Sequence, residues 1–223
     1  MPAYSAEALI LRTHRFGEAD LIVVFLTRDR GKRRGVAKNA VKSRRRFGAA
    51  LEPLTRGTVA YFEKEQRELV RLDRIDTKAS PLASAMRGTA GSVALGHAGY
   101  FAELLDEWAP EAHANEKLFR LGASVGDALS EGAPVAPLAR YFEYWLLRLE
   151  GVYPDMTASG MSDEALDFLR LAGETPPAAV GTLRLGRTAA RELEAAHRRL
   201  IAMHLEKDLR SARVLREIGP DLL

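Results

Sequence analysis

The sequence of 223 residues predicts an α+β fold, with a small β-barrel up to about residue 80 followed by helices. Up to residue 80, short apolar runs are rich in β-branched and aromatic residues and are separated by turn residues. After Ser80-Pro81, the apolar spacing changes from two residues to about 3.6 residues. The charge divides at the same place. Residues 1–80 hold 18 Lys and Arg against 10 Asp and Glu, a balance of +8, whereas residues 81–223 hold 15 against 20, a balance of −5.

Five short strands are expected in the first part of the chain, at residues 8–11, 21–26, 35–37, 58–62 and 69–72. A small barrel accommodates five such strands well, because closure leaves no exposed sheet edge. We therefore predict a domain of residues 1–80 that forms a five-stranded barrel of the OB type.

Helical periodicity predicts an all-α domain over residues 81–223, with apolar stripes within residues 101–108, 118–129 and 138–149 and a long last helix after Thr188. Residues 151–186 are richer in Gly and Pro, and we expect them to be irregular around one short helix with Ser162 as its N-cap. We expect the large aromatic residues of the stripes to form the helical core, and a groove for a peptide or another subunit is the alternative. These residues are Trp108, Phe142, Tyr144 and Trp145.

The composition excludes several classes of function. Without Cys there is no disulfide, thiolate zinc site or cysteine nucleophile, and the chain fits a reducing compartment. No stretch approaches the roughly 20 apolar residues that cross a bilayer, so we expect a cytoplasmic protein without membrane contact. Phosphate-loop, dinucleotide, zinc-protease and serine-hydrolase motifs are missing, so we expect no catalytic residues, cofactor or metal. His197 and His204 are interpreted as core or surface histidines, with a metal pair as the alternative.

The strongest functional signal is a basic run from Arg28 to Arg46, with ten basic residues and one acid. If residues 32–38 form a strand, Lys32, Arg34 and Lys38 share one face, and Arg33 lies on the other. Residues 42–46 then form an exposed loop. Such a surface binds phosphates by charge, so its affinity falls with salt and it contributes little to sequence choice. The predicted nucleic-acid-binding residues are Lys32, Arg33, Arg34, Lys38, Lys42, Arg44, Arg45, Arg46 and Phe47.

This assignment leaves alternatives open. The basic run is also compatible with a solvated positive face that binds nothing, and less so with attraction to a membrane surface, because it lacks the apolar face of an amphipathic helix. Phe47, beside the three arginines, is a candidate for stacking on a base, with packing in the core as its alternative.

Several segments together resemble a known family. They are residues 17–27, 31–32, 35–38, 43–44 and 51–53 in the first part, and 199–201, 204–205, 209–211 and 214–215 in the tail. They are similar, in the same order, to segments of the bacterial recombination mediator RecO. The resemblance implies an OB-fold joined to a helical domain, binding of single- and double-stranded DNA, and annealing of complementary strands. It also implies partnership with RecR and single-strand binding protein, which together help to load RecA.

Two departures from that family stand out. Many of its members carry four cysteines in a zinc-ribbon insert, whereas residues 151–186 here have none. Where the family reads Gly-Ala-Arg, this chain has Asn39-Ala40-Val41. Asn adopts a left-handed turn almost as Gly does, and Lys42 offsets the missing arginine.

We therefore predict a non-enzymatic DNA repair and recombination mediator that binds and anneals DNA. It would act with RecR and single-strand binding protein, and indirectly with RecA. The alternative is an RNA-binding OB-fold adaptor that docks through its helical domain.

Overall fold

The structure is a computed structural model that describes residues 2–43, 46–64, 68–87, 91–154, 160–207 and 209–218, without the side chains of residues 216–218. Within these residues the first part of the chain forms a closed barrel of five strands, which are β1 (Ala3–Phe16), β2 (Asp20–Thr27), β3 (Gly31–Ala37), β4 (Arg56–Phe62) and β5 (Val70–Ala79). The predicted five-stranded OB-type barrel is confirmed. The strands are longer than expected, because polar residues continue the pairing beyond the apolar runs.

The barrel has the strand order β1-β2-β3-β5-β4 and closes through the pairing of β4 with β1. All neighbouring strands are antiparallel except β3 and β5, which pair in parallel over residues 35–37 of β3. A bulge between Ile10 and Arg12 lets β1 bend, so that its first half pairs with β4 and its second half with β2.

Two separate hydrophobic cores explain the near-continuous apolar runs of β1 and β2. Because side chains alternate along a strand, Ala8 and Ile10 point into the barrel, and Leu9 and Leu11 join the core of the helical part. Val24 and Leu26 of β2 also lie in the helical core. These strands are therefore buried on both faces, a situation that favours unbroken apolar sequence.

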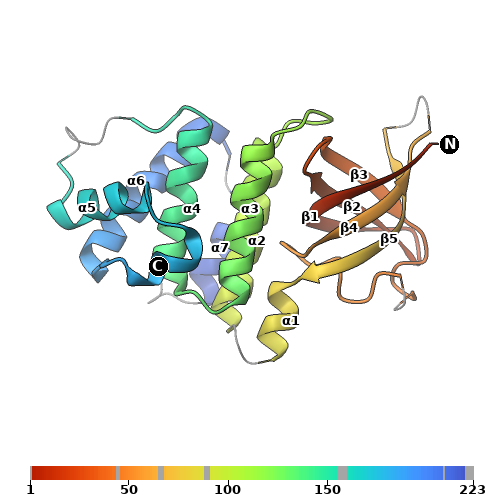
Figure 1. Ribbon diagram of the computed structural model, residues 1–223, viewed down its shortest axis with the longest axis horizontal. Coiled ribbons are helices and arrows are strands. Elements are labelled where there is room, and N and C mark those ends of the chain that lie inside the picture. Colours follow the sequence, from red (N-terminus) through yellow and green to blue (C-terminus); the bar gives the residue numbers. More distant parts are fainter. Residues whose placement is uncertain are drawn as a thin grey trace.

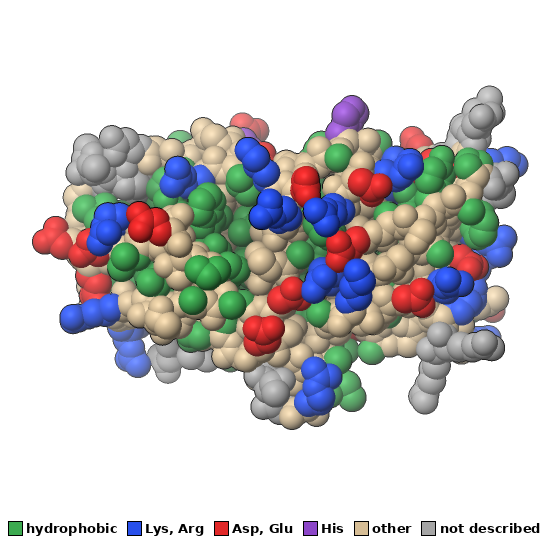
Figure 2. Space-filling view, viewed as in Figure 1, with side chains coloured by type: hydrophobic (Ala, Val, Ile, Leu, Met, Phe, Trp, Pro, Cys, Tyr) green, Lys and Arg blue, Asp and Glu red, His purple; other side chains and the backbone are tan. Residues whose placement is uncertain are grey.

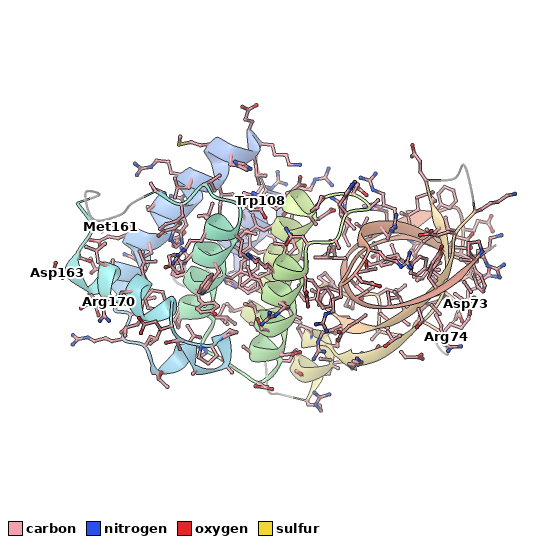
Figure 3. All side chains as sticks on the ribbon, turned by 45° about the horizontal axis from the view of Figure 1, so that its top comes forward. Asp73, Arg74, Trp108, Met161, Asp163 and Arg170 are labelled. Carbon is pink, nitrogen blue, oxygen red and sulfur yellow. The ribbon has the colours of Figure 1, made fainter. Side chains whose placement is uncertain are left out.

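The helices follow in chain order: α1 (Pro81–Met86), α2 (Ser92–Trp108), α3 (Glu116–Ser130), α4 (Val135–Leu149), α5 (Asp163–Ala172), the 3₁₀ helix η2 (Pro177–Thr182), α6 (Arg187–Leu205) and α7 (Arg210–Ile218). Figure 1 shows the barrel at one end of an elongated molecule, with α2 and α3 between the barrel and α4 to α6, and with α1 on the barrel side, directly after β5. Figure 3 shows Asp73 and Arg74 on β5 at the barrel end, and Met161, Asp163 and Arg170 at the opposite end.

Gly122 of α3 allows a close approach between α3, α2 and the barrel. A Cβ at this position would lie 2.6 Å from Leu105 of α2 and 2.9 Å from Leu9 of β1. The absence of a side chain therefore lets α3 pack tightly against both elements.

The large aromatic residues belong to the helical core, as predicted. Phe142, Tyr144 and Trp108 are buried, and Trp145 is half-buried against the same cluster. Trp108 also stacks on the ring of His204.

A buried polar network crosses the helical core. His197 is fully buried; its ring nitrogens lie 3.0 Å from Glu143 and 2.9 Å from the Tyr153 hydroxyl. Tyr100 donates a hydrogen bond to Glu143, and Arg140 lies 3.3 Å from the same carboxylate. Burial raises the pKa of Glu143, but Arg140, His197 and Tyr100 together outweigh it and lower that pKa overall. His197 is thus a satisfied core histidine.

The expected N-cap of α5 has a different bonding pattern from the one predicted. Ser162 occupies the N-cap position, but its hydroxyl donates to Glu192 of α6 at 2.5 Å and caps no backbone amide of α5. The serine therefore joins two helices.

Candidate nucleic-acid interface

Lys32 of β3 is buried at the junction between the barrel and the helices. Its exposed fraction is 8%, and its ammonium group donates to the backbone oxygen of Asp106 at 2.5 Å. Carboxylate oxygens of Asp106 and Glu111 lie 3.3 Å and 3.4 Å away. This corrects the expectation that Lys32 is exposed for binding, because all these contacts compete with a phosphate for its charge.

The segment that follows α2 covers the edge of β3. Lys32 donates its backbone N–H to Pro110 at 3.2 Å, and Ala112 donates to the carbonyl of Lys32 at 3.1 Å. Gly31 has a positive φ of 70°, and a Cβ there would lie 2.2 Å from the His113 backbone oxygen. This close approach requires glycine and fixes the segment against the barrel.

Arg34 and Arg33 lie on opposite faces of β3, as the alternation predicts. Arg34 is exposed and pairs with Glu111 at 2.8 Å, whereas Arg33 is half-buried and lies 3.6 Å from Glu63. Both arginines thus have a carboxylate neighbour. The ion pair between Arg34 and Glu111 is exposed to solvent, and such pairs are weak.

Lys38 and Lys42 are exposed in the turn after β3. Asn39 adopts the left-handed conformation expected of it, with φ of 54°, and its N–H donates to the Asp20 side chain at 2.7 Å. Val41 donates its N–H to the Ala19 carbonyl at 3.1 Å. These bonds hold the turn after β3 against the β1–β2 turn.

Arg46 stabilises this loop, and Phe47 anchors it. Arg46 donates to the Lys38 carbonyl at 2.5 Å and to the Ser43 hydroxyl at 3.1 Å, and it lies over the Phe47 ring. Phe47 has an exposed fraction of 2% and belongs to the barrel core. The packing alternative therefore describes Phe47, and the expectation of base stacking there is corrected. Arg44 and Arg45 lie outside the described residues.

Helical carboxylates partly neutralise the basic surplus of the barrel. Figure 2 shows acidic and basic side chains interleaved where the barrel meets the helices. The ion pairs that join the two parts include Arg12–Asp106 at 2.5 Å, Arg28–Glu116 at 2.6 Å, Arg34–Glu111 at 2.8 Å and Arg56–Asp127 at 2.8 Å. The charge asymmetry of the sequence thus reflects, in part, attraction between the barrel and the helical part.

One sheet face of β1, β2 and β3 extends beyond the helices. The rows across these strands, going away from the helical core, are Arg12–Val24–Arg34, then His14–Ile22–Val36, then Phe16–Asp20. Phe16 has an exposed fraction of 48%, and His14 is also exposed. We call this surface the outer sheet face; it is formed by the exposed residues Arg12, His14, Phe16 and Arg34 and the half-buried residues Ile22 and Val36.

His14 lies among positive charges. Partial burial lowers its pKa, and Arg12, Arg210 and Arg34 lower it further, against the opposing effect of Asp106. A cleft of about 700 Å³ next to His14 is lined by residues of β1, β3, α2 and the start of α7. Arg12, Lys32, Arg34, Lys207 and Arg210 supply its cations, and Glu103, Asp106 and Glu107 its carboxylates.

The sequence prediction missed the outer sheet face because it ended the first strand at residue 11. A signal was present: Arg12, His14 and Phe16 continue the spacing of two residues that is typical of a strand. Within the described part of the chain, no group of three or more His, Cys, Asp or Glu is placed to hold a metal. None of the helices described is long and apolar enough to span a membrane.

Comparison with known proteins identifies the family. The model of the recombination protein O N-terminal region matches residues 1–81, and that of its C-terminal region matches residues 92–160. The DNA repair protein RecO of Anaeromyxobacter sp. (strain K) is 32% identical over 246 residues, covering 95% of this chain and 95% of that protein. The chain belongs to the RecO family.

Other RecO proteins match with higher identity over shorter stretches. The RecO of Koribacter versatilis is 46% identical over 162 residues, which are 73% of this chain and 64% of that protein. The RecO of Geobacter sulfurreducens is 37% identical over 145 residues, which are 65% of this chain and 57% of that protein. The resemblance to RecO is confirmed, and with it membership of a family of DNA repair proteins.

Proposed function

We propose that this RecO-family chain is a recombination mediator that binds single- and double-stranded DNA, anneals complementary strands and assists loading of RecA. In this role it would act with RecR on DNA coated by single-strand binding protein. The observation that carries the proposal is membership of the RecO family together with an OB-type barrel that has exposed cations, without ion-pair partners among the described residues, where the turn after β3 meets the β1–β2 turn.

Three of the cations at this place are Arg15, Lys38 and Lys42. All three are exposed, and none makes an ion pair with another described residue. Arg15 is the last residue but one of β1, and the turn that carries both lysines is bonded to the β1–β2 turn. Phosphates would therefore meet uncompensated positive charge at this end of the barrel, with Arg44 and Arg45 close in sequence.

Annealing needs no catalytic group. Two complementary strands repel each other through their phosphates, and a basic surface that neutralises these charges lowers the repulsion while the bases pair. We therefore propose that the chain is not an enzyme, and an absence of DNA cleavage with added Mg²⁺ or Mn²⁺ is the expected result.

Charge reversal tests the proposed surface. The double variant Lys38→Glu/Lys42→Glu should weaken binding to a single-stranded oligonucleotide at least about tenfold at low salt, because two phosphate contacts are lost. The slope of log K against log salt should become less steep by about 1.4, at about 0.7 per phosphate. Fluorescence anisotropy titrations at several salt concentrations measure both quantities.

A matched control is Arg170→Glu/Arg191→Glu, which makes the same charge change on exposed positions of α5 and α6 at the far end of the molecule. Its affinity and salt slope should stay close to those of the unchanged protein. Equal losses in both variants would mean that only net charge matters, and an unchanged Lys38→Glu/Lys42→Glu variant would refute the assignment.

The partners and the type of nucleic acid need separate tests. Pull-downs with RecR and with single-strand binding protein should retain both proteins. Binding of DNA and RNA oligonucleotides of equal sequence, together with a strand-annealing assay, tests the alternative of an RNA adaptor. Selectivity for RNA without annealing would favour that alternative.

A further inference from the structure

We propose that Phe16 is a stacking platform for an unpaired base, and that it gives the chain a preference for single-stranded over double-stranded DNA. This inference rests on the proposed function, because it assumes that DNA lies on this end of the barrel. The occupant is one strand of DNA laid along the outer sheet face.

The position of Phe16 is fixed by the backbone around it. Phe16 is the last residue of β1, and it pairs with Asp20, the first residue of β2. The turn between them begins with Gly17, which has a φ of 73°. Asp20 in turn accepts the N–H of Asn39 at 2.7 Å. An aromatic ring held at the end of a paired strand loses little conformational freedom when a ligand binds, and this favours binding.

The surroundings of the ring fit a nucleic acid strand. His14, two residues back along the same face of β1, is exposed, and Ile22 beside it is half-buried, so an apolar and aromatic floor continues from the ring. Lys38 follows Val36 by two residues and so borders this floor, without an ion-pair partner among the described residues. Arg15, also without such a partner, lies at the same strand end but on the opposite face of β1. Glu18 and Asp20 are the acids of the turn, and the Asp20 side chain already accepts the amide of Asn39.

The chemistry selects an unpaired base. A base offers a π-face of about the area of the phenyl ring, whereas in a duplex both faces of every internal base are already stacked. Duplex DNA could contact the surrounding cations through its phosphates but would leave Phe16 without a partner. Loss of the ring should therefore affect single strands selectively.

The test compares Phe16→Ala with the unchanged full-length chain in binding to an oligo(dT) single strand and to a duplex of equal length. We expect about a tenfold loss of affinity for the single strand, the usual effect of removing one base-stacking ring, and less than about a twofold loss for the duplex. The salt slope should stay the same, because no phosphate contact is removed. Phe16→Trp should restore affinity, and oligo(dT) should quench the fluorescence of the added indole.

Met203→Ala is the matched control, since it removes another exposed apolar side chain, on α6. It should leave both affinities unchanged. Thermal melting of each variant checks folding, and because Phe16 is about half exposed, little change is expected.

The outcomes separate the inference from the proposed function. If the unchanged chain binds single strands with a steep salt slope, and Phe16→Ala loses nothing or loses equally on duplex, the stacking role is refuted and the proposed function stands. If Phe16→Ala alters only capture of RecR or single-strand binding protein, the ring belongs to a protein contact and the inference also fails. If the unchanged chain binds no DNA at all, both proposals fail.

Discussion

Replacing Asp106 by Asn should destabilise the protein strongly, because it leaves Lys32 buried beside one fewer carboxylate. The side chains of Lys32 and Asp106 have exposed fractions of 9% and 5%, and their charged atoms are 3.3 Å apart. Asn keeps nearly the same shape and can still form hydrogen bonds, so the change removes mainly the charge.

The size of the effect follows from this geometry. Two unit charges at 3.3 Å attract by about 5 kcal/mol at an effective dielectric constant of about 20, before desolvation is subtracted. Breaking a buried ion pair by removing one partner usually costs about 3–5 kcal/mol. Glu111 remains 3.4 Å from the ammonium group, and we therefore expect Asp106→Asn to lower the free energy of unfolding by about 2–4 kcal/mol.

A double-mutant cycle in urea measures this interaction. Lys32→Met removes the buried cation but keeps most of the aliphatic chain, so the double variant should cost less than the sum of the single variants, by about 1–3 kcal/mol. Lys32→Met should also leave the salt slope of DNA binding unchanged. Additive single effects, or a salt slope that falls for Lys32→Met, would refute the structural role assigned to Lys32.

Three further predictions concern the packing and the helical part. Gly122→Val should lower the free energy of unfolding by about 1–3 kcal/mol in urea titrations, because its side chain must displace Leu105; a neutral result would contradict the close packing. Glu103→Ala should cost about 1 kcal/mol and speed amide exchange in residues 209–218, because its carboxylate accepts the backbone N–H of Ser211 in the first turn of α7; unchanged exchange would count against this cap. Burial lowers the pKa of His97 in the folded protein. His97 therefore binds a proton more readily in the unfolded protein, and the free energy of unfolding falls as the pH drops below about 6.5. His97→Asn should flatten that fall in thermal melts, and an unchanged profile would exclude His97 as its cause.

The alternation of side chains made the barrel predictable from sequence. Runs such as residues 21–26 carry β-branched and aromatic residues between turns, and each falls largely within one of the five strands. The second half of the first strand was missed, because Arg12 and His14 carry no apolar signal although their backbones are paired. Pairing depends on the neighbouring strand, which local sequence does not reveal.

The basic run showed where charge lies but not which charges are free. Lys32 and Lys38 look equivalent in sequence, yet one is buried against Asp106 and the other is exposed. The carboxylates that distinguish them are more than 70 residues away in the chain. Acids gathered between residues 103 and 116 were a usable hint, since a basic barrel beside acidic helices predicts ion pairs across the junction.

Phe47 and Phe16 show the same limit for aromatic residues. Phe47 stands among arginines in the sequence but is drawn into the barrel core, whereas Phe16 precedes Gly17 at a strand end and stays exposed. Burial of a single ring depends on how the loop folds back, and that is a tertiary property.

Crosslinking of bound DNA would identify the residues of this chain that lie against the strand. A single-stranded oligonucleotide that carries bromodeoxyuridine would be irradiated on the full chain, and the attached peptides mapped by mass spectrometry. We predict attachment within residues 12–22 and 34–46, which hold the outer sheet face and the turn after β3. Attachment mainly to α5 and α6 at the far end of the molecule would contradict it.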